Sequence, residues 1–169
     1  VQALLEQGRP TFDKDTYKVS GGLQGVGVSV VNALSTTLKV VVNRGGKTYQ
    51  QEYAMGKPLY AVKTTGDTKD TGTQVTFKAD NSIFMVERYD YEILSSRLRE
   101  LAFLNSGVRI LLRDRRHEEI REHDLYYEGG IAAFVKWLDR NKQALHPDPI
   151  AISAGENGIG IDVALEWND

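Results

Sequence analysis

The sequence predicts an α/β fold, a two-layer sandwich in which helices cover one face of a mixed, mainly antiparallel sheet. Three observations favour this fold class. Short β-branched segments occur in pairs joined by glycine-containing turns, as in hairpins. Helical segments alternate with these pairs rather than with single strands. Hydrophobic residues make up 41% of the 169 residues, which is enough for a packed core.

In the first part of the chain, the sequence predicts one helical segment before a glycine-rich loop and one after it. Residues 3–7 end a predicted helix, which Gly8-Arg9-Pro10 breaks. The loop at residues 21–27 precedes a predicted helix at residues 28–34. The apolar face of this helix is predicted from positions four residues apart, Val26, Val30 and Leu34. Because the chain starts with Val1, we expect the fold to be incomplete at its N-terminus.

Three strands are predicted next. Residues 38–42 are rich in β-branched side chains, and residues 48–53 supply a partner strand. Gly45-Gly46 between them predicts a hairpin turn. Residues 73–77 predict a further strand.

The next segment predicts a helix, a hairpin and a second helix. Asp90 is a suitable N-cap for a helix whose apolar face would contain Leu94, Leu98 and Leu101. Residues 108–112 and 120–126 predict two paired strands. Residues 131–138 predict a helix that follows Gly129-Gly130.

A domain boundary is predicted near the end of the chain. Pro147 and Pro149 interrupt the pattern of secondary structure. Two strands follow, at residues 150–153 and 159–167. We therefore expect the first domain to end at residue 149.

Composition excludes several classes of site. The net charge of −2 argues against strong nucleic-acid binding by this segment itself, and the basic run at residues 113–116 is short and contains an aspartate. The chain has no cysteine, which excludes disulfides, thiolate metal sites and thiol catalysis, and fits a reducing, cytoplasmic location. No apolar run approaches the roughly 20 residues that span a bilayer, so no membrane association is expected. The histidines lack metal-ligand spacing and are interpreted as surface residues: His117, His123 and His146.

The glycine-rich loop at residues 21–27 is the strongest candidate for a binding site. Its glycines allow the backbone to approach a ligand closely. The helix that follows directs its N–H groups and the positive end of its dipole back toward the loop, which suits phosphate oxygens. From the residues alone, a phosphate site and a simple turn remain equally open.

Three better-known motifs fit this chain less well. The dinucleotide fingerprint is G-x-G-x-x-G, whereas the loop has the reverse spacing from Gly22. Gly46-Lys47-Thr48 resembles the end of a P-loop, but Val41 occupies the position of its first glycine and the segment is a predicted hairpin turn. A nucleophile elbow around Ser29 would need glycine where the chain has Val31.

A longer stretch carries a resemblance to a known family. Residues 17–35, Tyr-Lys-Val-Ser-Gly-Gly-Leu-Gln-Gly-Val-Gly-Val-Ser-Val-Val-Asn-Ala-Leu-Ser, resemble the third ATP-binding motif of the ATPase subunits of bacterial type IIA topoisomerases, especially the gyrase B family. Residues 70–77 resemble the fourth motif, whose threonine, here Thr73, lies by the adenine. Residues 98–107 and 127–131 match further landmarks of these ATPases.

The resemblance implies the Bergerat ATP-binding fold and an ATP ligand. Residues 1–149 would be the C-terminal part of the ATP-binding domain, and residues 150–169 the start of the transducer domain. The ATP-binding residues that it implies are Tyr17, Gly21, Gly22, Leu23, Gln24, Gly25, Val26, Gly27 and Thr73.

Two departures from the family pattern concern the phosphates. Family members usually carry histidine where this chain has Gln24, which can donate to a phosphate but cannot become cationic. The usual lysine of the lid segment is replaced by Thr11, for which Arg9 is a weak substitute.

The motifs with the family's general-base glutamate, magnesium-ligand asparagine and adenine-binding aspartate are not among these residues. We therefore expect no catalytic residue and no Mg²⁺ ligand in this chain, and no hydrolysis by the chain alone.

The resemblance also implies the role of the parent protein. It would be an ATP-dependent type IIA DNA topoisomerase that dimerises on binding ATP, works with a gyrase A-type cleavage subunit, and couples hydrolysis to DNA strand passage and supercoiling. Two alternatives stay open. One is the ATPase component of topoisomerase IV, its B subunit. The other is a degenerate paralogue that binds nucleotide without hydrolysing it, which Gln24 and Thr11 favour.

Overall fold

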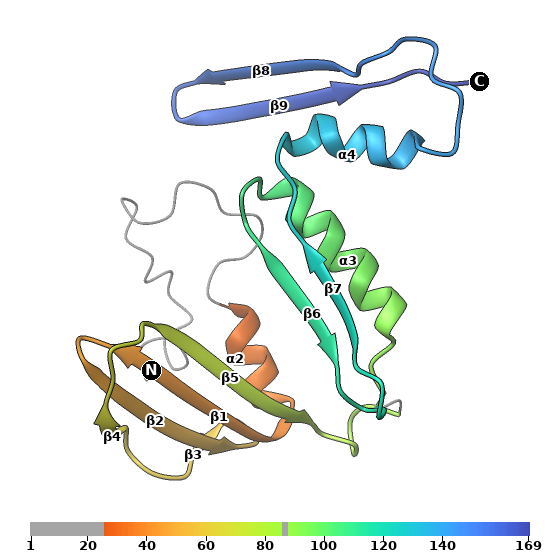
Figure 1. Ribbon diagram of the computed structural model, residues 1–169. Coiled ribbons are helices and arrows are strands. Elements are labelled where there is room, and N and C mark those ends of the chain that lie inside the picture. Colours follow the sequence, from red (N-terminus) through yellow and green to blue (C-terminus); the bar gives the residue numbers. More distant parts are fainter. Residues whose placement is uncertain (1–25, 86–87) are drawn as a thin grey trace. The chain divides into compact units, whose positions relative to one another are not determined.

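The computed structural model describes residues 26–85 and 88–169, with the side chain of Val26 excepted. The chain forms two compact units, Val1–Arg88 and Tyr89–Asp169 (Figure 1). Each unit is described by itself below.

The first unit is a helix on an antiparallel sheet. The order of the strands is β3-β2-β1-β5, and β4 pairs with the same edge of β2 as β3 does, further along the strand. Every pairing in this sheet is antiparallel. The elements are α2 (Val26–Ala33), β1 (Ser35–Arg44), β2 (Lys47–Ala54), β3 (Lys57–Pro58), β4 (Lys63–Asp67) and β5 (Gly72–Ala79).

The predicted turn between β1 and β2 is confirmed. Gly45 and Gly46 have φ angles of 60° and 79°, the left-handed values that a two-residue type I′ hairpin turn requires. The adjoining Lys47 and Thr48 lie in strand β2 and not at the start of a helix. The segment is therefore a hairpin turn and not a P-loop.

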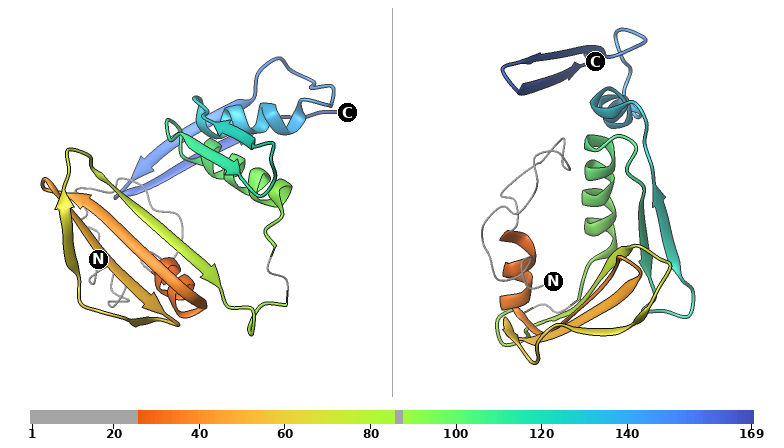
Figure 2. Two further views of the ribbon diagram at one scale, coloured as in Figure 1. Left: turned by 60° about the horizontal axis from the view of Figure 1, so that its bottom comes forward. Right: turned by 90° about the vertical axis from the view of Figure 1, so that its left-hand side faces the viewer.

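The core of the first unit lies between α2 and the sheet. Leu38, Val40 and Tyr53 are buried, and Val28 and Val31 of the helix pack against them. Figure 2 shows α2 lying against one face of this sheet.

The helix face predicted from Val26, Val30 and Leu34 was wrong. Val30 is 46% exposed, whereas Val28 and Val31 contact the core. Because the helix sequence is VGVSVVNA, with valine at half of its positions, apolar periodicity does not single out one face.

The second unit contains two helices and two separate hairpins. Its elements are α3 (Tyr91–Leu104), β6 (Ile110–Asp114), β7 (Arg121–Leu125), α4 (Gly130–Asp139), β8 (Ile150–Glu156) and β9 (Ile159–Leu165). Strands β6 and β7 pair with each other, and so do β8 and β9, in both cases antiparallel. The start of β8 at Ile150 agrees with the predicted strand. The domain boundary at residue 149 remains a prediction.

Helix α3 begins as predicted, and its predicted apolar face is only partly buried: Leu94 and Leu98 are half-buried. The carboxylate of Asp90 accepts a hydrogen bond from the backbone N–H of Ile93 at 3.0 Å, which confirms the N-cap. Leu101, assigned to the apolar face, is 49% exposed. The buried residues follow a stripe displaced around the helix: Tyr91, Ser95, Ala102 and Phe103.

Aromatic stacking explains the displaced stripe. Phe103 stacks on Tyr127 with 3.7 Å between ring centroids, and its ring lies 5.2 Å from that of Phe134 in α4. Trp137 continues the cluster, 6.3 Å from Phe134. These rings bury the C-terminal end of the stripe, whereas Tyr91 and Ser95 at its other end contact His123 of β7.

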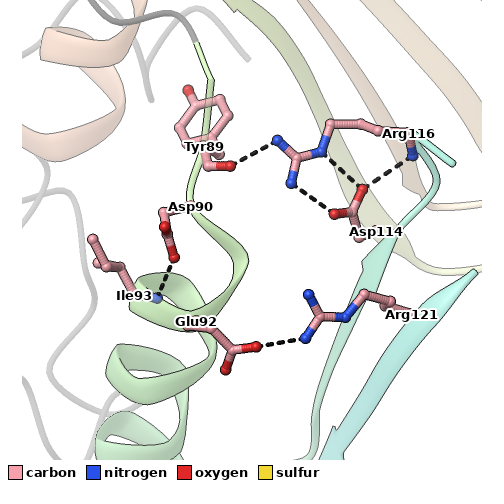
Figure 3. Close-up of polar contacts among 7 residues, drawn as sticks. All are labelled: Tyr89, Asp90, Glu92, Ile93, Asp114, Arg116 and Arg121. Carbon is pink, nitrogen blue, oxygen red and sulfur yellow. Dashed lines mark hydrogen bonds and ion pairs between the residues drawn. The ribbon is translucent and has the colours of Figure 1, made fainter.

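Charged side chains fix the start of α3 against the β6–β7 hairpin (Figure 3). Arg116 donates to both carboxylate oxygens of Asp114, from Nε at 2.9 Å and from Nη2 at 2.7 Å. Its Nη1 donates to the backbone carbonyl of Tyr89 at 2.7 Å. Arg121 of β7 pairs with Glu92 in the first turn of α3. The turn of the hairpin and the entry to the helix are thus held together.

The predicted fold class is confirmed. The described strands pair only in antiparallel fashion, and each of the two units contains helices as well as strands. Within the described residues the strands belong to three sheets, one of five strands and two of two. None of the helices in this part of the chain is long and apolar enough to cross a membrane.

Candidate functional site

The predicted ATP-binding residues are only partly within the described chain. Val26 is the first residue of α2, Gly27 is the second, and Thr73 lies in β5. The remaining predicted positions are outside the described residues, so their part in a site stays a prediction: Tyr17, Gly21, Gly22, Leu23, Gln24 and Gly25.

The first turn of α2 has the electrostatic character of an anion site. The first four N–H groups of an α-helix have no acceptor within the helix, and the helix dipole adds a partial positive charge there. Helix α2 has no acidic residue in its first turn, so none of its own carboxylates competes for that positive end. Within the described residues, α2 therefore presents an acid-free first turn of the kind that suits a phosphate group.

The other end of α2 is anchored to the sheet. The hydroxyl of Ser35 donates to the carbonyl of Val31 at 2.6 Å, and the backbone N–H of Met55 donates to the carbonyl of Ser35 at 3.0 Å. The β2–β3 turn also approaches closely, because a Cβ built on Gly56 would lie 3.4 Å from the Cα of Ala33. These contacts fix the direction in which the first turn of the helix points.

No contact among the described residues requires glycine at position 27. A Cβ built on Gly27 has no atom of the described chain within 4 Å, and its φ angle is not in the left-handed region. Glycine inside a helix is less favourable than alanine by about 1 kcal/mol. Within the part of the chain that the structure describes, Gly27 therefore leaves open space beside the first turn of α2.

Thr73 lies on the same face of the sheet as α2. It is paired directly with Val42 of β1, and residues directly opposite each other share a face. Val42 packs against the core that α2 covers. The side chain of Thr73 is exposed, so its hydroxyl is accessible on the helix side of the sheet.

The described residues contain no group of three metal-ligating side chains. His123 is half-buried and its Nδ1 lies 2.7 Å from the hydroxyl of Ser95, so the prediction of a surface position was wrong for this histidine. His117 is exposed as predicted, whereas His146 is half-buried, with its Nδ1 2.7 Å from the carbonyl of Asp148. In the part of the chain that the structure describes, no cluster of side chains could take the place of the Mg²⁺ ligand that we expect outside this chain.

The basic run at residues 113–116 is largely neutralised by its neighbours. Arg113 pairs across the hairpin with Glu122, and Arg116 pairs with Asp114. The hydrogen bonds from Arg116 hold the pKa of the Asp114 carboxyl well below its usual range. The sequence indicated this neutralisation, because acidic residues alternate with basic ones in this segment. The ion pairs argue against an anion site at this run.

The sequence has close relatives among known proteins. No protein-family model matches it. The chain is 52% identical over 158 residues to the B subunit of DNA gyrase from Staphylococcus epidermidis, a match that covers 93% of this chain and 25% of that protein. It is 51% identical over 165 residues to the B subunit of DNA gyrase from Chitinophaga japonensis, covering 93% of this chain and 34% of that protein.

A solved structure agrees with these sequences. The crystal structure of the 43K ATPase domain of Thermus thermophilus gyrase B, in complex with an aminocoumarin, superimposes with a TM-score of 0.76 at 34% identity. The match covers 86% of this chain and 40% of that chain. The chain belongs to the DNA gyrase B family. It spans between about a quarter and two-fifths of the length of these gyrase B proteins.

Proposed function

We propose that this chain forms part of the ATP-binding region of a gyrase B protein, and that the glycine-rich loop and the first turn of α2 bind the phosphates. The observation that carries the proposal is the start of α2, where an acid-free first turn coincides with a glycine whose Cβ position is open among the described residues. The similarity to the gyrase B ATPase domain supports ATP as the ligand.

The backbone N–H groups would act as fixed dipoles. Held by the anchored helix, they stabilise negative charge without transferring a proton and without reorganising as charge develops. Gln24 would add one neutral donor to a phosphate oxygen. Thr73, on the helix side of the sheet, would place its hydroxyl near the adenine.

Mg²⁺ bound by the parent protein would neutralise phosphate charge. The described residues supply no set of ligands for it. On this proposal, the contribution of this chain is to bind the phosphates of the nucleotide.

For the parent protein we propose an ATP-dependent type IIA DNA topoisomerase, with DNA as substrate. Binding of ATP would dimerise two copies of the protein, and a gyrase A-type subunit would cleave the DNA. We also propose a cytoplasmic location, which the lack of cysteine supports. Gyrase is favoured over topoisomerase IV because the relatives named above are gyrase B proteins.

A second candidate is a paralogue that binds ATP and does not hydrolyse it. Gln24 and Thr11 favour it, because each replaces a residue that is cationic or able to become so in the family pattern. The two candidates share the phosphate site and differ only in whether they hydrolyse the bound ATP.

The test uses the full-length protein with its gyrase A-type subunit and relaxed circular DNA. We expect negative supercoils to appear with ATP and not with a non-hydrolysable analogue, and calorimetry to show binding of the analogue. Binding without supercoiling or hydrolysis would favour the non-hydrolysing paralogue. No binding of the analogue would refute the proposal itself.

A further inference from the structure

The strands of the first unit carry an uneven distribution of charge. Residues directly opposite each other in a sheet share a face, so the pairing of the strands assigns each side chain to one of two faces. One face contains Leu38, Val40 and Tyr53 and is covered by α2 (Figure 2). We name the opposite face the lysine face. Its charged strand residues are four lysines and one glutamate: Lys39, Lys57, Lys63, Lys78 and Glu52.

Alternation along the strands places these lysines. Lys39 lies between Leu38 and Val40, whose side chains point to the core, so its own side chain points away from α2. The other three lysines are paired with residues that also adjoin a buried residue of their strand: Lys78 with Thr37, Lys57 with Ala54 and Lys63 with Gln50.

Most of the positive charge of the lysine face is not neutralised. The Nζ of Lys39 lies 3.9 Å from Oε1 of Glu52, which is the acid of this face. The other three lysines are exposed, and within the described residues none of them forms an ion pair. The Nζ of Lys63 lies 4.1 Å from the centre of the Tyr60 ring, a contact that holds the ammonium in place and keeps its charge. The net charge of −2 of the whole chain therefore conceals a local positive surface.

The remaining side chains of the lysine face are mainly polar. Thr37, Gln74 and Thr76 are exposed, and side chains of these types donate hydrogen bonds to phosphate oxygens in protein–DNA interfaces. The apolar strand residues of this face, Val41 and Ala54, are small and half-buried. Protein-binding surfaces are usually centred on large anchors such as tryptophan, tyrosine or arginine in well-packed pockets. The composition of the lysine face therefore fits nucleic acid better than protein.

The lysine face is large enough to contact several phosphates. Neighbouring strands lie about 4.8 Å apart, so β5 and β3 are separated by about 14 Å across the sheet. Lys78 lies at the level of Thr37 and Lys63 at the level of Val41, and β1 rises by about 14 Å between these levels. B-DNA carries one negative charge per about 1.7 Å of its axis, so about 14 Å of duplex presents about eight phosphates.

We propose that the lysine face is a contact surface for the phosphate backbone of duplex DNA in the full-length protein. The inference rests on the proposed function in one respect, because it takes DNA as the substrate of the parent protein. It concerns the face of the sheet opposite α2 and not the nucleotide site. Since a lysine meets a phosphate as a point charge, the contact is independent of base sequence.

The test compares three variants of the full-length protein. The double variant Lys57→Gln, Lys78→Gln removes two exposed charges of the lysine face. The double variant Arg44→Gln, Lys69→Gln is the matched control, because it removes two exposed charges near the β1–β2 turn, outside the lysine face. Glu52→Gln removes the acid of the face and so makes the face more positive.

Fluorescence anisotropy of a labelled linear duplex of random sequence measures the affinity for DNA, without nucleotide, over a series of KCl concentrations. Each phosphate contact contributes about 0.9 to the slope of log affinity against log salt concentration. We expect Lys57→Gln, Lys78→Gln to reduce this slope by about 1.8 and to weaken binding on the order of tenfold at about 0.1 M KCl. The control should bind as the unsubstituted protein does, and Glu52→Gln should bind DNA more tightly.

The outcomes that overturn the inference are specific. Unchanged affinity and salt slope in Lys57→Gln, Lys78→Gln would overturn it, and so would an equal loss in the control, which would reflect total charge only. Loss of binding to poly-aspartate with DNA binding unchanged would assign the face to an acidic protein. A gain of affinity in Glu52→Gln cannot arise from misfolding, so the lack of that gain would also contradict the inference.

The proposed function is tested separately, by calorimetry with the non-hydrolysable ATP analogue. If the unsubstituted protein does not bind the analogue, the proposed function fails, whatever the lysine variants show with DNA. If the analogue binds and Lys57→Gln, Lys78→Gln keeps its full affinity for DNA, only the inference about the lysine face fails.

Discussion

Substitution of Gly27 by alanine separates a role in folding from a role in binding. Among the described residues the new Cβ would meet nothing within 4 Å, so no clash with them opposes the change. Alanine is favoured over glycine inside a helix by about 1 kcal/mol. About 1 kcal/mol corresponds to a rise of about 2–4 °C in melting temperature for a unit of 150–250 residues, and to a smaller rise in a longer protein. We therefore expect Gly27→Ala to be slightly more stable than the unsubstituted protein when no ligand is present.

The expected effect on binding has the opposite sign. A methyl group on the first turn of α2 would occupy space next to backbone N–H groups that, on our proposal, donate to the phosphates. A hydrogen bond to a charged group is worth about 1.5–3 kcal/mol. Loss of one such bond would weaken binding of an ATP analogue by roughly tenfold to a hundredfold.

The assay combines calorimetry and thermal denaturation on the full-length protein. Gly66→Ala is the matched control, because Gly66 also has open space around it and no left-handed φ angle, and it lies in strand β4. The control should bind the analogue normally. Unchanged affinity in Gly27→Ala, together with a raised melting temperature, would show that the start of α2 is only a helix terminus.

Three further predictions concern the chain itself. Residues 1–169 alone should not hydrolyse ATP, because the motifs with the family's general base and metal ligand are absent from them, and steady phosphate release above a protein-free blank would contradict this. Leu38→Ala removes a buried core side chain and should lower the free energy of unfolding by about 2–5 kcal/mol in urea titrations, whereas Thr37→Ala at an exposed neighbour should change little. Hydrogen bonds from Arg116 lower the pKa of Asp114, so this pair stabilises the fold above about pH 4 and loses its effect as the pH falls toward the lowered pKa. Asp114→Asn should therefore flatten the fall in melting temperature below about pH 4, and an unchanged slope would be evidence against the pairing.

The sequence alone predicted those helices and turns whose ends depend on only a few neighbouring residues. Asp90 caps α3 because its carboxylate reaches an N–H three residues away, and this requires no distant contact. Gly45 and Gly46 form the hairpin turn because both positions need a left-handed φ angle. The β-branched residues of β1 and β5 likewise indicated those strands, although β1 extends beyond the predicted residues 38–42 at both ends.

Packing between elements was predicted less well. The buried faces of α2 and α3 depend on which partner each helix meets, and apolar spacing alone misassigned Val30 and Leu101. In α3 the decisive contact is that of Phe103 with Tyr127, two residues far apart in the sequence. The bond between Arg116 and the carbonyl of Tyr89 likewise follows from the fold and not from spacing.

The candidate site was predicted mainly by resemblance. From residues alone, the glycine-rich loop was equally consistent with a phosphate site and a turn. The structure adds the acid-free first turn of α2 and the open space at Gly27. It also puts Thr73 on the sheet face that α2 covers, which the sequence order did not indicate.

The most direct test of the central claim is a structure of the full-length protein with a non-hydrolysable ATP analogue. We predict phosphate oxygens about 3 Å from the backbone nitrogens at residues 25–27, and the adenine beside the hydroxyl of Thr73. Phosphates bound elsewhere, with the first turn of α2 facing only solvent, would contradict the assignment of this segment as the phosphate site.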